Sequence, residues 1–233
     1  MRVLALETSA RAVSAAVTED GRVLCSGYQD TGLTHSRTLM PMVEAMLKNA
    51  GLTVRDCDAV AVAAGPGSFT GIRIGVSAAK GLAFGAERPC AAVSTLEAMA
   101  RNVSHMDALV VCAMDARRHQ IYNALFTAEG GRLTRRTPDR AVGLAELAEE
   151  LRGETAPLVI VGDGAALCEA SLREAGIPCR LAPAHLVMQN AMSVALCGED
   201  LARAGKLVSA QELLPVYLRP PQAQRLRDRM SQP

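Results

Sequence analysis

The feature that most limits the folds open to this sequence is a weak internal repeat, which starts again near residue 109. Short segments recur at one constant offset: Ala5-Leu6-Glu7 as Ala113-Met114-Asp115, Val13 as Ile121, and Ala16-Val17 as Ala124-Leu125. Each copy has the pattern strand, strand, strand, helix, strand, helix, with a Gly-x-Gly turn after its fourth strand. Self-similarity of this kind indicates a duplicated unit. The chain is therefore predicted to form two similar α/β lobes.

Apolar patterning places the elements within each copy. In the first copy it predicts strands at residues 2–6, 12–17, 22–28, 59–64 and 89–93, and helices at 36–50 and 70–86. The second copy has a strand from 109, a helix at 141–151 and a strand at 158–161, followed by a helix at 187–204, a short strand or extended arm at 213–218 and a mobile tail at 219–233. Because proline has no backbone N–H, Pro41 is expected to delay the regular part of the first helix to about Met40.

A glycine turn, Gly65-Pro66-Gly67, joins a buried strand to the second helix, for which Thr70 is the predicted N-cap. Backbone N–H groups at such a helix start can hold an anion. A tight strand-to-helix turn explains the same glycines and is the preferred interpretation. Each glycine inside a helix costs about 0.8–1 kcal/mol relative to alanine. This helix also contains Gly71, Gly75 and Gly81, so close packing by another element is expected to stabilise it.

Composition and charge narrow the class of protein. A chain of 233 residues can bury a sizeable core without disulfides. A formal net charge of +1 argues against a protein that holds a nucleic-acid backbone unaided. The seven cysteines stand singly, which favours reduced thiols and gives no zinc site. No signal peptide and no membrane-spanning stretch is recognisable, so a cytoplasmic protein without a membrane partner is expected.

The residue patterns of common enzymes are missing from the sequence. No two of the four histidines are spaced as helical metal ligands, and no serine has a G-x-S-x-G setting. The Gly-Lys pair at 205–206 is followed by Leu207, which excludes a phosphate-binding Walker A loop. We therefore assign no catalytic residue, no metal ligand and no cofactor.

Two acids, Glu7 and Asp115, end equivalent strands of the two copies. Such acids can face each other across a cleft and hold a hydrated magnesium ion. Alternatively, each caps its own hairpin turn, which is the slightly preferred interpretation. Glu7, Thr8, Asp115, Gly162 and Gly164 are grouped as a candidate remnant of a nucleotide cleft.

The first two helices carry more apolar and small residues than one face of a sheet needs. The first helix contains Met40, Met42 and Met46, and methionine is a soft, adaptable side chain that is common at docking surfaces. Ordinary core packing explains any one of these residues. Together with the glycines of the second helix, they favour a helix-pair interface.

The sequence resembles the TsaB (YeaZ) family over its whole length. The resemblance rests on Leu4-Ala-Leu-Glu-Thr-Ser9, His35-Ser36 with Leu39 and Pro41, Gly65-Pro-Gly-Ser-Phe-Thr-Gly-Ile-Arg-Ile-Gly75, Met114-Asp-Ala-Arg117 with Ile121-Tyr122, and Pro215-Val-Tyr-Leu-Arg219. It implies the actin-like/Hsp70/sugar-kinase (ASKHA) fold, with two duplicated lobes of RNase H-like topology. The N-terminal lobe, 1–98, would carry the dimerisation helices, and the C-terminal lobe would be 99–233.

The same resemblance implies a non-catalytic scaffold subunit. Such a subunit binds a TsaD-type threonylcarbamoyltransferase as a heterodimer, is joined by a TsaE-type ATPase, and meets tRNA only through the complex, which forms threonylcarbamoyladenosine beside the anticodon. In the family the first two helices pack against the paralogue as a four-helix bundle. Carried onto this sequence, the interface residues are Leu39, Val43, Met46, Leu47, Gly71, Ile72, Gly75, Val76 and Ala79.

The substitution Val43→Glu or Gly75→Glu is then expected to abolish complex formation and leave the fold intact. Self-pairing of the isolated chain through the same helices stays open. The alternative function is an ATP-dependent phosphotransferase or a glycoprotease-like hydrolase working between the lobes. It is motivated by Glu7, Asp115 and the two Gly-x-Gly turns. Tight binding of Mg-ATP by the isolated chain would favour that alternative.

Overall fold

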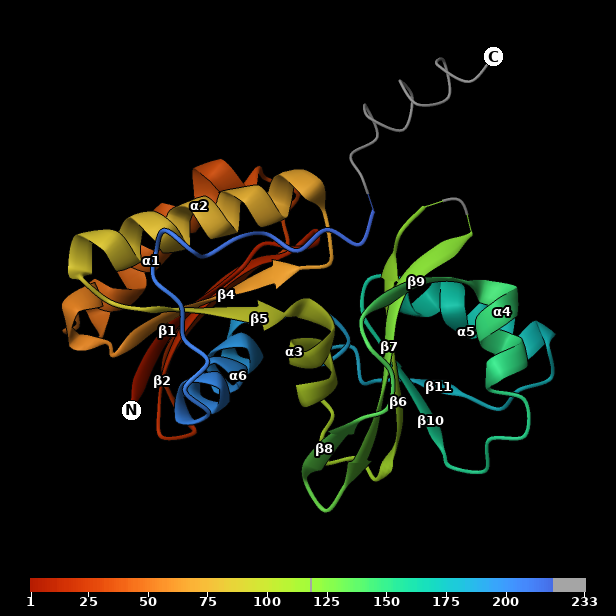
Figure 1. Ribbon diagram of the computed structural model, residues 1–233. Helices are drawn as coiled ribbons and strands as arrows, with labels where there is room; N and C mark the ends of the chain where they lie inside the picture. The colour runs from red at the N-terminus through yellow and green to blue at the C-terminus, as the bar shows by residue number, and fades with distance from the viewer. Residues whose placement is uncertain (118, 220–233) are drawn as a thin grey trace, which may run out of the picture.

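The computed structural model describes residues 1–117 and 119–219. Its first sheet has the strand order β3-β2-β1-β4-β5 (Figure 1). β2 pairs antiparallel with β1 and β3, whereas β4 pairs parallel with β1 and β5. The strands are β1 (Arg2–Glu7), β2 (Val13–Glu19), β3 (Arg22–Gln29), β4 (Ala59–Gly65) and β5 (Cys90–Ser94).

The second sheet repeats this arrangement. Read from its antiparallel edge, its order is β8-β7-β6-β10-β11, and β9 adds a further pairing to β7. The strands are β6 (Ala108–Asp115), β7 (Gln120–Glu129), β8 (Arg132–Arg135), β9 (Arg140–Gly143), β10 (Leu158–Val161) and β11 (Arg180–Leu181). Since β6 takes the place of β1 and β10 that of β4, the duplication predicted from the sequence is confirmed.

Helices cover both faces of the first sheet because its strands alternate in side-chain direction. Leu4 and Val60 point to the face covered by α1 (His35–Asn49) and α2 (Phe69–Ala86). Val3 and Ala61 point to the opposite face, which α6 (Ala191–Arg203) covers (Figure 1). Small residues line that second face, so the backbone of α6 can approach the sheet closely. A short 3-10 turn, Val54–Asp56, precedes β4.

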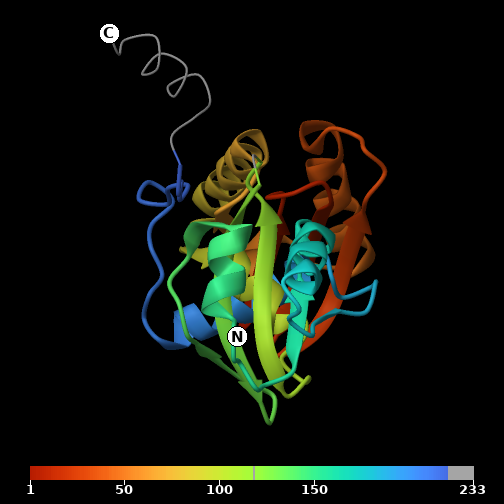
Figure 2. The same ribbon diagram turned by 90° about the vertical axis from the view of Figure 1, so that its right-hand side faces the viewer.

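The second sheet is covered in the same way. Figure 2 views the molecule from the side on which α4 (Leu144–Glu150) and α5 (Ala165–Glu174) lie on its outer face. α3 (Thr95–Arg101) packs on the other face through Leu96 and Met99. α3 and α6 therefore lie between the two sheets, where Arg101 pairs with Asp200 at 2.6 Å.

Some local predictions are wrong. α1 begins at His35 and continues through Pro41, which is exposed, so the carbonyl that this proline leaves unpaired lies on the solvent side. The helix predicted at 141–151 begins later than expected. Residues 140–143 form strand β9 and pair with β7, and α4 starts only at Leu144. Of the two alternatives predicted at 213–218, a short strand or an extended arm, the strand does not form.

The predicted interface residues need the largest correction. Seven of them are only 0–7% exposed and face the first sheet, and the glycines are buried too: Leu39, Val43, Met46, Leu47, Ile72, Val76 and Ala79, with Gly71 and Gly75. In an amphipathic helix, the stripe that packs on its own sheet cannot also face a partner. Other residues of α1 and α2 must therefore form their outward surface.

The boundary predicted at 98/99 separates the two copies of the repeat, but it does not separate two independently packed cores. α6 belongs to the second segment in sequence, yet its Val194 and Ala195 pack in the core of the first sheet. The predicted mobile tail falls, from residue 220 on, outside the described residues. All seven cysteines are free thiols, and five are buried. None of the helices within residues 1–117 and 119–219 has the length and apolar character that a membrane span requires.

Candidate functional site

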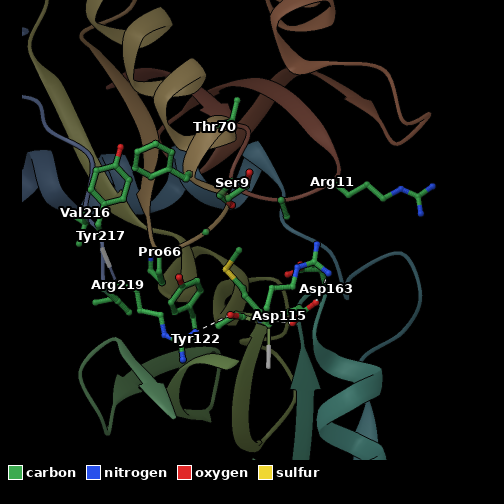
Figure 3. Close-up of a pocket in the computed structure, with 18 residues that line it drawn as sticks. Ser9, Arg11, Pro66, Thr70, Asp115, Tyr122, Asp163, Val216, Tyr217 and Arg219 are labelled. Atoms are coloured by element: carbon green, nitrogen blue, oxygen red, sulfur yellow. Dashed lines mark hydrogen bonds and ion pairs between the residues drawn. The ribbon is translucent and has the colours of Figure 1, made fainter. Parts of the chain in front are cut away.

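A cleft of about 540 Å³ lies where the carboxyl ends of β1, β4, β6 and β10 meet. In Figure 3, Ser9, Pro66 and Thr70 lie on one side of it, and Asp115, Tyr122 and Asp163 lie on the other. Its lining comes from both lobes and the C-terminal segment: residues 9–11, 66–70, 114–117, 122, 163 and 216–219. Binding sites of α/β proteins commonly form at this position, so the cleft is the first candidate site.

The two strand-end acids cap their own turns. Glu7 Oε1 accepts the backbone N–H of Ser9 at 2.5 Å, and Asp115 Oδ1 accepts the backbone N–H of Arg117 at 2.7 Å. Both bonds span two residues, so the acids have the same local role in the two lobes. Asp115 lines the cleft, whereas Glu7 is fully buried and does not. This arrangement matches the capping interpretation.

The first glycine turn is bonded within its own lobe. The backbone N–H of Ser68 donates to the Ser9 carbonyl at 2.7 Å. Ser68 Oγ accepts the N–H of Gly71, so Ser68 is the N-cap of α2 and the assignment to Thr70 is wrong. Thr70 instead lines the cleft.

Gly71 and Gly75 allow α2 to approach the end of β1. Thr8 Oγ1 donates to the Gly71 carbonyl at 2.8 Å. A Cβ atom on Gly71 would overlap the Thr8 carbonyl oxygen, and one on Gly75 would overlap Thr8 Oγ1. The close packing expected for these glycines therefore comes from the chain's own Thr8, which is buried beneath the cleft.

The second glycine turn is also internally bonded. The N–H of Gly162 donates to the Val187 carbonyl at 2.6 Å, and the N–H of Gly164 donates to the Ala113 carbonyl at 3.0 Å. Between them, the carboxyl of Asp163 lines the cleft and accepts a bond from Gln189. A phosphate group here would meet an acid instead of these two amides.

Burial dominates the electrostatics beneath the cleft. It raises the pKa of the Glu7 carboxyl from its usual 4.5 to about 7, and the nearby Asp163 adds to this rise. Burial likewise raises the pKa of Asp163. Glu7 Oε2 has no hydrogen-bond partner among the residues that the structure describes. An uncharged carboxyl avoids the desolvation cost of a buried charge, which explains the direction of the shift.

The Glu7→Gln variant is expected to remove much of the pH dependence of stability between pH 4.5 and 7. Folded Glu7 binds its proton more tightly than unfolded Glu7, so its contribution is complete below pH 4.5 and is lost as pH rises through about 7. A pKa difference of this size corresponds to at most about 3.4 kcal/mol in the free energy of unfolding. Urea unfolding at pH 5, 6, 7 and 8 measures it, with the exposed Glu44→Gln as the matched control. If the free energy of unfolding changes equally with pH in wild type and in Glu7→Gln, the buried Glu7 carboxyl is not the source of the pH dependence.

At the cleft, arginine and aromatic side chains from both lobes form contacts that were not predicted from the sequence. The Arg73 guanidinium carbon lies 3.9 Å from the centroid of the Phe69 ring, and Arg73 Nε donates to Tyr217 Oη at 2.9 Å. The Phe69 and Tyr217 rings are 4.9 Å apart. Arg219 lies over Tyr122 at 5.9 Å. These residues are far apart in sequence. The one sequence signal that could have identified them is that they belong to the motifs on which the family resemblance rests.

A second candidate site is the outward helix face, the exposed stripe of the α1/α2 pair. Its members recur every three or four residues, as one side of a helix requires. Phe84 is 69% exposed, and the small Ser77 and Gly81 precede it. The name is used for the exposed residues Arg37, Met40, Pro41, Glu44 and Lys48 of α1 and Ser77, Gly81 and Phe84 of α2. Gly81 and Phe84 also border Ala210 and Gln211 of the C-terminal segment.

Neither candidate site contains an evident metal centre. Among the residues that the structure describes, no group of three or more His, Cys, Asp or Glu side chains is placed to hold a metal ion. The cleft combines acids with arginines, and the outward helix face combines both charges with apolar residues.

Comparison with known proteins relates this geometry to a family. A family model described as TsaD, tRNA N6-adenosine threonylcarbamoyltransferase, matches residues 29–225. The protein named tRNA threonylcarbamoyladenosine biosynthesis protein TsaB from Escherichia coli (strain K12) is 34% identical over 225 residues, covering 94% of this chain and 95% of that protein. The solved structure of YeaZ from Pseudomonas aeruginosa has a TM-score of 0.79 at 30% identity, covering 93% of this chain and 99% of that one.

More distant structures share only the fold. The ROK hexokinase from Thermus thermophilus has a TM-score of 0.50 at 15% identity, covering 88% of this chain and 100% of that one. With the repeated sheet order, this likeness confirms the two-lobed ASKHA fold expected from the sequence.

Proposed function

The chain belongs to the TsaB (YeaZ) family of tRNA threonylcarbamoyladenosine biosynthesis proteins, and from this premise we propose that it is the non-catalytic subunit that binds a TsaD-type paralogue. A TsaE-type ATPase would join the pair, and tRNA would be met in the cytoplasm only through the assembled complex. The observation that carries the proposal is the outward helix face, which is the exposed side of the α1/α2 pair.

The composition of that face suits helix-against-helix docking. Ser77 and Gly81 leave room for a partner helix, and Met40 and Phe84 supply exposed apolar side chains. Met40 is 42% exposed, whereas the neighbouring Leu39 is buried against the sheet. Interface cores favour methionine and aromatic residues, and small residues let helices approach closely. A paralogue with the same paired helices would present a surface of similar shape.

The geometry of the cleft gives less support to the enzyme alternative. A phosphotransferase needs backbone amides directed at phosphate oxygens. The amides of Ser68, Gly162 and Gly164 instead bond to the chain's own carbonyls. The acid Asp163 occupies the centre of the second glycine turn. These features favour a scaffold whose cleft is not adapted to nucleotide turnover.

The test uses the full chain with the TsaD-type paralogue of the same organism. Size-exclusion chromatography with light scattering is expected to give one species of combined mass, and calorimetry of the chain alone with Mg-ATP is expected to give no stoichiometric heat. Two separate peaks together with a tight Mg-ATP site would favour the enzyme alternative.

A further inference from the structure

The segment that follows α6, residues 205–219, runs along the first lobe and then reaches the second (Figure 1). We name it the C-terminal strap. At its start, Val208 and Cys90 exchange backbone hydrogen bonds of 2.8 and 2.9 Å at the free edge of β5. Lys80 of α2 then donates to the carbonyls of Gln211 and Leu213, both at 3.1 Å. Leu213 is fully buried in the core beneath α2, so this part of the strap is fixed to the first lobe.

The strap next pairs with the end of β4. The backbone N–H of Val216 donates to the Ala64 carbonyl at 2.7 Å. The following residue, Gly65, has a φ of +132°, and a Cβ atom there would overlap the Val216 carbonyl oxygen. The glycine of this turn therefore leaves room for the strap, since any side chain would displace it.

The last described residues carry the strap into the second lobe. Tyr217 is still held on the first lobe by Arg73. Two residues later, Arg219 Nη1 donates to the carbonyl of Ala116 at 2.9 Å, and its guanidinium lies over the ring of Tyr122. Ala116 follows β6 and Tyr122 belongs to β7, so both contacts are made with the second lobe.

We propose that the C-terminal strap fastens the two lobes together at a fixed angle and forms one wall of the cleft. The segment Val216 to Arg219 lines that cleft directly (Figure 3). A cleft that admits and releases a ligand by lobe opening would have to break the Arg219 contacts or pull Val216 from β4. The strap thus makes the chain a rigid body. This inference concerns the isolated chain and does not depend on the proposed partner.

Hydrogen exchange of the full-length chain tests the strap. Arg219→Ala removes a charge-assisted bond, and such a loss is expected to raise amide exchange about tenfold or more in residues 113–124 and 214–219. The matched control is Arg152→Ala, which removes an exposed arginine whose ion pair, among residues 1–117 and 119–219, is with Glu149 of its own lobe. It is expected to leave both segments unchanged. A chain ending at Leu214 keeps Leu213 in the core and is expected to exchange faster still in residues 113–124.

Two outcomes would overturn the proposal. Exchange of residues 113–124 in Arg219→Ala within twofold of wild type would show that the strap does not hold the second lobe, whatever the shortened chain does. An equal rise in the Arg152→Ala control would show that the effect is not specific to the strap.

Discussion

Val43→Glu is expected to unfold the protein instead of selectively weakening partner binding. Val43 is 2% exposed and packs in the core that α1 and α2 form with the first sheet. Burying an unpaired carboxylate costs several kcal/mol, and typical total stabilities are about 5–15 kcal/mol. The free energy of unfolding is therefore expected to fall by at least about 4 kcal/mol, as measured by denaturant unfolding followed by circular dichroism.

The control for this variant lies on the same helix. Ala45→Glu places the same charge at an exposed position of α1 and is expected to change stability by less than about 0.5 kcal/mol. A folded Val43→Glu protein with nearly wild-type stability would contradict the packing described for α1. It would also restore the sequence-based expectation that this substitution leaves the fold intact.

The sheets were the most predictable part of the fold. Short apolar runs bounded by turn residues predicted the five strands of the first sheet to within one or two residues, because buried strands need such runs. The internal repeat then supplied the topology of the second sheet. The error at 141–151 arose because residues 140–143 pair with β7, and pairing partners 17–23 residues away leave no local signal.

The orientation of the docking helices could not be predicted from the sequence. α2 carries apolar or small residues on most of its sides, so its periodicity does not distinguish the stripe that faces the sheet. Gly71 and Gly75 suggested close approach by a partner, but the atoms that approach belong to Thr8. A contact between residues more than 60 positions apart becomes visible only in the folded chain.

The candidate cleft was predicted in part. Of the residues grouped as a candidate remnant of a nucleotide cleft, Asp115 lines the cleft, and a strand-end acid next to a turn is a local pattern. Glu7, Thr8, Gly162 and Gly164 lie around the cleft without lining it. Tyr122, Tyr217 and Arg219 were absent from the predicted set. The strap that brings two of them there is irregular, and irregular segments have no periodicity to read.

Met40→Glu is expected to weaken binding of the TsaD-type paralogue about 100-fold or more, with Ser77→Glu giving a similar loss. Both positions are exposed on the outward helix face, so neither substitution disturbs the core. A glutamate at the centre of a helix-against-helix interface would be desolvated without a partner, which typically costs 2–5 kcal/mol. Leu167→Glu is the matched control, because Leu167 of α5 is 40% exposed, close to the 42% of Met40, but belongs to the second lobe.

The most direct measurement is the dissociation constant of the full chain with its TsaD-type paralogue, titrated for wild type, Met40→Glu and Leu167→Glu. Leu167→Glu is expected to bind with the wild-type Kd, and Met40→Glu with a Kd about 100-fold or more higher. A Met40→Glu protein that is folded and binds within threefold of wild type would show that the outward helix face is not the docking surface.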